Sequence, residues 1–221
     1  MVAIPRGVAW NDEGGFSLIE LLIALFVSIG VMGAAVSVVS GVQNTYQHQM
    51  ADVTVEQEGR FALDWIRRVI EPAGSNPYSV NSTACPAAGT TIQPVRFDPD
   101  GNLANDDIRV QADVGIPDGL FVGAVGNCTQ ANEDVTIARS AASRAITRFD
   151  RGTDLAPVAI SDGIFSGLLF EYFDSGHNPT ATAGSVRFVR VTVTGQSRVR
   201  RPGMPAPTTF TLQTDVRLRT R

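Results

Sequence analysis

Apolar and polar residues follow one pattern near the start of the chain and another further on. Residues 21–42 carry no charged side chain, and apolar or small residues make up the whole run. A helix needs about 20 apolar residues to cross the hydrocarbon core of a bilayer. The segment therefore predicts a membrane-spanning helix.

The helical pattern continues beyond this run with a different spacing. Tyr46, Met50 and Val53 recur at steps of three and four residues, and a second group resumes the stripe: Phe61, Ala62, Trp65, Ile66, Val69 and Ile70. Such spacing predicts an amphipathic helix with one face against a sheet. Pro72 and Gly74 then end it. Residues 43–71 are therefore expected to form the second half of one long helix.

The rest of the chain alternates in the manner of β-strands. Phe210, Leu212 and Val216 are separated by polar residues, as expected for a strand with one buried face. The candidate strands are residues 91–98, 107–114, 135–139, 163–174, 185–194 and 208–218. We therefore predict an α+β fold, in which the second half of a long N-terminal helix packs on a C-terminal antiparallel β-sheet domain.

Composition and charge add little to this picture. Hydrophobic residues make up 43% of the chain and charged residues 18%, an ordinary globular balance with an apolar segment added. The formal net charge of −4 is too small to indicate a nucleic-acid partner by itself. Acids dominate residues 72–134 and arginines dominate residues 135–221. We expect these two stretches to neutralise each other within one domain.

Glu20 is the one acid at the edge of the apolar run. A carboxylate inside a membrane is unfavourable by several kcal/mol, although the cost falls near a helix end. Two interpretations stay open. Glu20 lies at the membrane interface and complements the positive helix N-terminus, or it meets a cation in an assembled state. A cut before Phe16 would supply that cation as a new α-amino group.

The stretch Gly15-Phe16-Ser17-Leu18-Ile19-Glu20, followed at once by the apolar run, resembles the prepilin signal of type IV pilins and type II secretion pseudopilins. The resemblance implies that prepilin peptidase, which is also the methyltransferase, cleaves between Gly15 and Phe16 and that the new Phe16 amine is N-methylated. It also implies that Glu20 pairs with that amine, usually of a neighbouring subunit. One feature departs from the family pattern, because such leaders usually carry several basic residues and here Arg6 stands alone.

This resemblance sets the expected domains and location. Residues 1–15 would be the leader peptide, 16–42 the transmembrane and assembly half of the helix, 43–71 its amphipathic half, and 72–221 a periplasmic or extracellular β-rich domain. The protein would cross the inner membrane once, with its C-terminal domain in the periplasm, and would reach the pilus after assembly. Cys85 and Cys128 lie in the exported part, where two cysteines suggest one disulfide.

The end of the helix narrows the resemblance. The string Gly59-Arg60-Phe61-Ala62-Leu63-Asp64, followed by Ala73-Gly74, is similar to PilW-type minor pilins. This implies a structural subunit that primes or caps a type IV pilus, with other minor pilins, the major pilin, the inner-membrane assembly platform and the lipid bilayer as partners. Two alternatives stay open: a J-like pseudopilin at the tip of a type II secretion filament, and a membrane-tethered protein that binds DNA or a surface.

Asp98, Asp100 and Asn102 are weak candidates for a calcium site, because alternate acids can place oxygens around the ion. The EF-hand pattern fails, since Leu103 stands where its Gly belongs and Arg109 where its closing Glu belongs. A plain turn rich in Pro, Asp and Gly is the simpler interpretation, and we expect no metal and no cofactor.

A basic loop of Arg198, Arg200 and Arg201 could contact the phosphates of DNA. Few aromatic residues lie nearby for stacking, so packing against acidic surfaces of neighbouring subunits is favoured over DNA binding. The sequence contains no Gly-x-Ser-x-Gly elbow, no His-Glu-x-x-His and no phosphate-binding loop. We therefore expect no catalytic residues and no enzyme.

Overall fold

The computed structural model describes residues 15–75, 93–114, 131–200 and 204–219. Within these ranges it contains one long α-helix, α1 (Leu18–Ile70), and two antiparallel sheets. The predicted α+β, pilin-like class is confirmed. The chain divides into two units, Met1–Gln47 and His48–Arg221, and each is described by itself.

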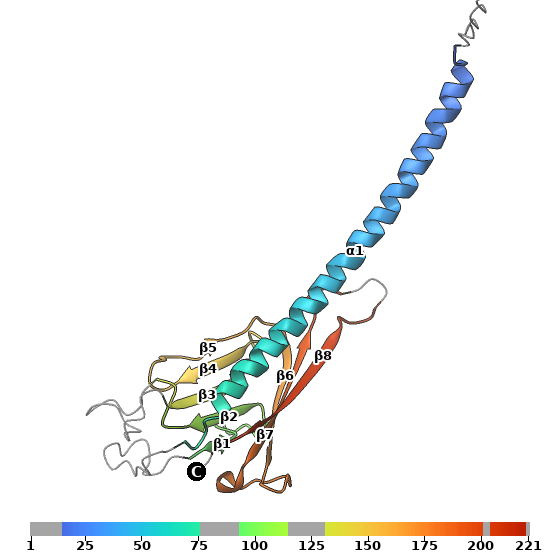
Figure 1. Ribbon diagram of the computed structural model, residues 1–221. Helices are drawn as coiled ribbons and strands as arrows, with labels where there is room; N and C mark the ends of the chain where they lie inside the picture. The colour runs from blue at the N-terminus through green and yellow to red at the C-terminus, as the bar shows by residue number, and fades with distance from the viewer. Residues whose placement is uncertain (1–14, 76–92, 115–130, 201–203, 220–221) are drawn as a thin grey trace, which may run out of the picture. The chain divides into compact units, whose positions relative to one another are not determined.

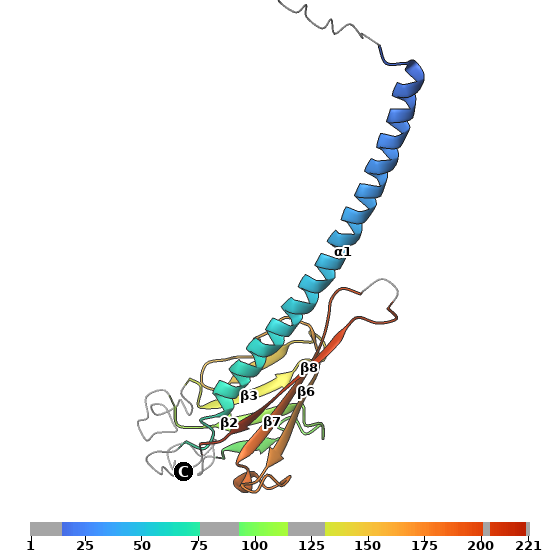
Figure 2. The ribbon, with the colours of Figure 1, turned by 45° about the vertical axis from the view of Figure 1, so that its right-hand side comes forward.

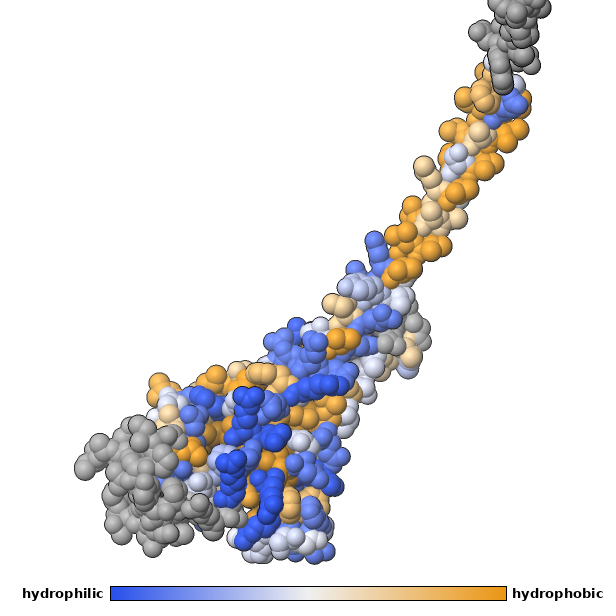
Figure 3. All heavy atoms as spheres, in the orientation of Figure 1, coloured by the Kyte–Doolittle hydropathy of each residue, from blue (hydrophilic) through white to orange (hydrophobic). Residues whose placement is uncertain are grey.

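The first unit contributes residues 18–47 of α1. Every residue from 15 to 47 is exposed, including the large apolar side chains Leu18, Phe26 and Met32. Figure 3 shows hydrophobic residues covering most of the visible face of this segment. Gly30, Gly33 and Gly41 have open space where a Cβ would stand. The segment therefore presents its apolar surface without a partner from its own unit.

The second unit contains the end of α1 and both sheets (Figure 1). Sheet A has the order β1-β2-β3-β4-β5 and sheet B the order β6-β7-β8, with antiparallel pairing throughout. Sheet A consists of β1 (Val95–Phe97), β2 (Asp107–Gln111), β3 (Asp134–Arg139), β4 (Ile146–Asp150) and β5 (Val158–Ala159). Sheet B consists of β6 (Phe165–Phe173), β7 (Phe188–Gln196) and β8 (Thr209–Arg217), and a short 3-10 helix, η1 (Ala183–Ser185), precedes β7.

Each of the six predicted strands overlaps an observed one, whereas β4 and β5 were not predicted. β4 buries only its first and last residues, Ile146 and Asp150, so it lacks the alternation that marks a strand in sequence. β5 has two residues, both exposed. In β7 the buried positions are Val189, Val191, Val193 and Gly195, a cleaner alternation than the sequence suggested.

One hydrophobic core joins the end of α1 to both sheets. Figure 2 shows this part of the helix lying along the strands of the same unit. The buried residues of the helix are Val55, Gly59, Ala62, Leu63, Ile66 and Ile70. They recur at steps of three and four residues and so form one face. From the sheets, Ile108, Ile137, Phe165, Phe170 and Val191 complete this core.

Part of the predicted stripe was wrong. Phe61 is 59% exposed, and Met50 and Val53 are also exposed. At 100° per residue, these three residues lie about 140–160° around the helix axis from Ile66 and so point away from the buried face. The helix therefore carries two apolar faces in this unit, and only one of them meets the sheets.

Gly59 marks a close contact between the helix and sheet B. A Cβ there would lie 2.5 Å from the ring of Phe210 and 2.9 Å from Leu212, both on β8. The same ring lies against Gly195 of β7, where a Cβ would stand 1.9 Å from it. Two glycines thus make room for one aromatic ring, and this contact sets how closely α1 approaches sheet B.

Within the described ranges, few ion pairs connect the acidic stretch to the arginine-rich stretch, although the two were expected to neutralise each other. Asp134, which is buried, accepts hydrogen bonds from the guanidinium of Arg109 and from Gln111, both on β2 of its own stretch. Arg151, from the arginine-rich stretch, is 3.7 Å from the same carboxylate. Other arginines of that stretch pair with its own acids, as Arg190 does with Asp215.

Candidate functional site

The N-terminus of α1 is capped by side chains of its own first residues. The carbonyl of Ser17 accepts the N–H of Leu21, so Ser17 is the N-cap residue. Its hydroxyl accepts the N–H of Ile19 at 3.3 Å, and the carboxylate of Glu20 accepts the N–H of Ser17 at 3.0 Å. The contact from Glu20 back to Ser17 is one half of a capping box, whereas the Ser17 hydroxyl bonds the N–H of Ile19 and not that of Glu20.

The capping box gives Glu20 a partner within the chain. Its negative charge also lies in the first turn, where the partial positive charge of the helix N-terminus stabilises it. Gly15 and Phe16 precede the helix, and the Phe16 side chain is 88% exposed. The peptide bond between them is therefore outside the hydrogen-bonded helix, in a form that a protease could reach.

The segment that follows has the dimensions of a membrane span. In the described part of the chain, α1 is the one helix long and apolar enough to cross a bilayer by length and composition. None of its most apolar stretch is buried inside the protein. Three features thus lie next to one another in the chain. They are an accessible peptide bond, the capped start of α1 and an apolar run that is not buried.

A comparison with protein families finds a known motif at this part of the chain. Residues 10–35 match the model of the prokaryotic N-terminal methylation motif. The chain therefore begins with the processing motif of type IV pilin-like proteins. None of the curated proteins and none of the solved structures compared with it matches.

The motif has direct consequences for this pilin-like protein. It implies processing by prepilin peptidase, and the apolar helix is consistent with membrane anchoring of a prepilin-like chain. Pilin-like proteins are structural subunits and are typically not enzymes. The match covers the region that holds Gly15, Phe16 and Glu20, the three residues expected to carry cleavage, methylation and assembly.

Other predicted site residues fall at different places. Cys85 and Cys128 lie outside the described residues, and so does Arg201. Arg198 donates to the carboxylate of Asp162 at 3.0 Å. Arg200 donates to the backbone carbonyl of Met204. In the described ranges, then, two of the three arginines proposed for DNA already have partners within the pilin-like chain.

Two of the weak calcium candidates, Asp98 and Asp100, come together with Asp107, the first residue of β2. Asp98, Asp100 and Asp107, here called the acidic cluster, each place one carboxylate oxygen within 4.8 Å of the other two. The oxygen of the Asn102 side chain is turned away, because it accepts the N–H of Ala104 at 2.6 Å. Its amide nitrogen instead donates to Asp100 at 2.8 Å. Asp107 therefore takes the place expected for Asn102.

Burial and mutual repulsion disfavour the charged carboxylates of the acidic cluster. Burial and then the charge of Asp100 raise the pKa of Asp107 to about 6, although a hydrogen bond from the Asp100 N–H lowers it. Burial also raises the pKa of the Tyr172 hydroxyl, with the charges of Asp107 and Asp98 acting in the same direction. The carboxylates of Asp98 and Asp107 and the Tyr172 hydroxyl are therefore close enough to interact electrostatically.

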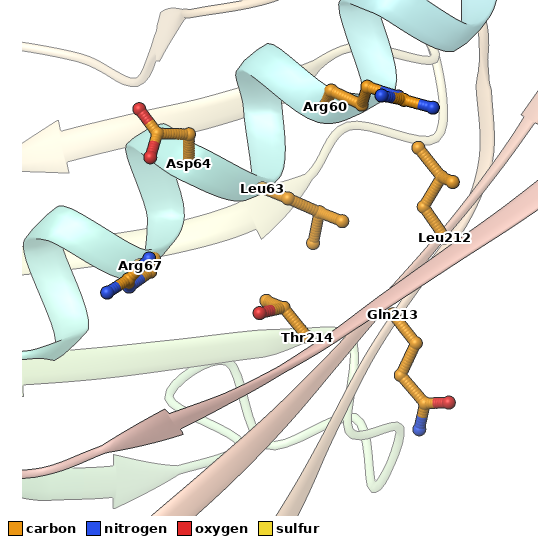
Figure 4. A pocket seen from close by; sticks show the side chains of 7 residues that line it. All are labelled: Arg60, Leu63, Asp64, Arg67, Leu212, Gln213 and Thr214. Atoms are coloured by element: carbon orange, nitrogen blue, oxygen red, sulfur yellow. The ribbon is translucent and has the colours of Figure 1, made fainter.

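A groove runs between α1 and β8 within the second unit (Figure 4). It is lined by Arg60, Leu63, Asp64, Arg67, Leu212, Gln213 and Thr214. Arg60 and Asp64 are engaged along the helix, with Glu56 and Arg68 respectively, each at 2.6 Å. The lining includes no histidine, cysteine or serine, so it offers none of the usual nucleophile–base pairs.

Sequence reasoning missed two contributors. Ser17 was readable, because Ser-x-x-Glu before an apolar run is the pattern of a capping box. Gly59 gave no signal of its role, because a glycine in a helix does not show what packs against it. Its function depends on the ring of Phe210, which lies about 150 residues further along the chain.

Proposed function

We propose that this chain is a PilW-like minor pilin that primes or caps a type IV pilus. The observation that carries the proposal is that every residue from 15 to 47 is exposed, although most of them are apolar or small. Such a surface must be covered in use, first by lipid and then by the helices of other subunits. A single-pass helix in the inner membrane that later enters a filament meets both conditions.

The second unit supports assembly by a separate feature. Met50, Val53 and Phe61 expose apolar side chains on the helix face that looks away from the sheets. Neighbouring helices of the major pilin or of other minor pilins would cover that face in a filament. The soluble domain would then lie outside the helical core, because its own core already covers the other face of the helix.

Glu20 would act at the moment of assembly. In the unprocessed chain its carboxylate caps the Ser17 N–H. Cleavage between Gly15 and Phe16 creates an amine one residue before this cap, and methylation keeps it charged. In a low-dielectric filament core, an ion pair between Glu20 and the Phe16 amine of a neighbour is far stronger than in water. The assembly platform would deliver subunits to that contact.

The subtype rests on the helix end. Gly59 admits the Phe210 ring, and it begins the Gly-Arg-Phe-Ala-Leu-Asp string that resembles PilW-type proteins. A J-like pseudopilin of type II secretion would share the same processing and the same helix. The DNA-binding alternative gains no support from Arg198, which is paired with Asp162. Loss of surface pili with normal protein secretion, after deletion of the gene, would separate the pilus from the secretion filament.

The direct test is Glu20→Ala beside the matched control Glu58→Ala, an acid further along the same helix. We expect Glu20→Ala to be cleaved and to reach the membrane, but to fall by about tenfold in sheared filaments, equivalent to the loss of 1.4 kcal/mol. Glu58→Ala should be incorporated normally. Normal incorporation of Glu20→Ala would show that the carboxylate has no assembly role.

A further inference from the structure

The β1–β2 loop (residues 98–106) contacts the start of β2 and strand β6. Phe97 pairs with Ile108, so the next residues outward, Asp98 and Asp107, face each other where the loop leaves the ladder. The N–H of Asp100 donates to the Asp107 carboxylate at 3.1 Å. A backbone bond of 2.8 Å from Phe170 to the carbonyl of Asn105 holds the loop against β6. The acidic cluster is thus placed by strand register and by two backbone contacts.

Asp107 is the residue that calls for a ligand. It is 2% exposed, and one of its carboxylate oxygens is buried with no hydrogen-bond partner. The charges that act on it come from Asp100, Asp98 and Asp106, which are all negative. A buried carboxylate beside like charges is unfavourable unless a cation or a donor compensates it.

A second buried polar atom lies beside the cluster. The hydroxyl of Tyr172, on β6, is buried without a hydrogen-bond partner, and the side chain is 7% exposed. Its ring contacts that of Phe97, with centroids 4.1 Å apart. The charges of Asp107 and Asp98 act on this hydroxyl. Two orphaned polar atoms at one place indicate a missing component, because buried polar groups are almost always satisfied.

We propose that Asp98, Asp100 and Asp107 bind one calcium ion that fixes the β1–β2 loop against β6. The donors are all carboxylate oxygens, which select a hard cation over zinc or copper. Calcium binds oxygens at about 2.4 Å, so ligands on opposite sides of one ion are separated by about 4.8 Å. The three oxygens lie within that limit of one another.

The hydrogen bonds already present do not block the ion. Asp98 accepts the N–H groups of Asn102 and Leu103, each at 2.9 Å, and Asp100 accepts that of Asn102 at 3.1 Å. A carboxylate has about four lone-pair positions, so an oxygen that accepts an N–H can also bind a metal. These bonds orient the carboxylates in advance. Water would complete the coordination, and the Tyr172 hydroxyl would donate to it or to a carboxylate.

The ion would add stability to the sheet domain, independently of any role in a filament. Binding to the folded state alone stabilises it in proportion to the logarithm of ligand concentration over Kd. Extracellular calcium modules bind at about 0.1–1 mM, which is the affinity range expected of three carboxylates on a short loop. The loop and the strand β6 would then unfold together.

The test uses the full chain in detergent after removal of metal ions, followed by calcium chloride. At a tenfold excess over Kd the midpoint of thermal unfolding should rise by about 3–6 °C. Magnesium at the same concentration should give a clearly smaller rise, because it requires a stricter octahedral geometry. No calcium binding in equilibrium dialysis at about 10 mM, well above the range of extracellular modules, would overturn the proposal.

Asp107→Asn identifies the site. It keeps an acceptor for the Asp100 N–H but removes the charge, so the midpoint should rise in the absence of calcium and no longer respond to it. Asp100→Asn, on the exposed side of the loop, should also remove the response, and it serves if Asp107→Asn does not fold. Asp174→Asn is the matched control, because Asp174 also accepts loop N–H groups, at 2.8 and 2.9 Å, outside the acidic cluster. A full calcium response in both cluster variants would refute the assignment.

Terbium replaces calcium and emits when a nearby tyrosine is excited. Tyr172→Phe should lose most of this emission while it keeps the calcium-dependent shift, because the hydroxyl is not a direct ligand. Calcium should displace terbium from the wild-type chain. Emission that survives Tyr172→Phe unchanged would place the ion elsewhere and contradict the proposal.

Discussion

The two parts of α1 differ in polarity and in burial, as expected for one helix that meets two different environments. Residues 18–47 are mostly apolar and none of them is buried, whereas residues 48–70 are mixed in polarity and bury one face. Isoleucines illustrate the difference: Ile29 is 60% exposed and Ile66 is completely buried. Hydrophobicity alone therefore does not identify the core of this protein. The first part supplies an apolar surface for an assembly, and the second supplies the core of a domain.

The largest effect should come from truncating the same residue type in both parts. Ile66→Ala removes buried atoms from the core between α1 and the sheets, so it should destabilise the domain by about 2–5 kcal/mol. Ile29→Ala should leave the domain unchanged. Chemical unfolding followed by tryptophan fluorescence measures both, because Trp65 packs against the core. Equal destabilisation by the two variants would show that the first part also contributes to the folded domain.

A smaller effect is expected at the glycines. Gly59→Ala places a methyl group 2.5 Å from the Phe210 ring, so the ring or the helix must move. We expect a net loss of about 1–3 kcal/mol, after a helix-propensity gain of up to about 1 kcal/mol. Gly33→Ala meets open space, so it should leave the unfolding of the domain unaltered.

The Gly59 result depends on contact and not on propensity. If steric conflict causes the loss, Gly59→Ala combined with Phe210→Leu should be less destabilised than the sum of the single variants, because the shorter side chain leaves room. Additive losses would mean that the helix and β8 are not in close contact at this point.

The fold was readable from the sequence where one signal dominated. An uncharged run of 22 residues, 21–42, predicts a helix without help from tertiary structure. Phe61 was misplaced for a definite reason: the second part of the helix has apolar residues on two faces, and periodicity cannot tell which face meets the sheets. β4 was missed because its burial does not alternate. Both errors concern which partner an element meets, and this information lies elsewhere in the chain.

The candidate sites follow the same rule. Glu20 and Phe16 are close in sequence, so a local pattern was sufficient to nominate them. The acidic cluster was predicted only in part. The sequence nominated Asp98 and Asp100, whereas Asp107 lies beside them only because β1 pairs with β2. The orphaned hydroxyl of Tyr172 arrives from the other sheet. No spacing rule connects residues that only tertiary structure brings together.

The smallest effect concerns acid. Residues 15–47 contain one carboxyl group, Glu20, so the acid sensitivity of folding must come almost wholly from the second unit. There the N–H of Asp150 and then the guanidinium of Arg148 hold the pKa of Asp154 below its usual value. A carboxyl whose pKa is lowered by folding stabilises the protein above its unfolded pKa, near 4, and this contribution is lost as the pH falls through the folded pKa. Asp154→Asn should therefore lower the unfolding midpoint slightly at pH 7, and the difference from wild type should shrink as the pH falls below the unfolded pKa and then through the folded one. A difference that stays constant from neutral to acid pH would mean that Asp154 acts through its hydrogen-bond geometry and not through its charge.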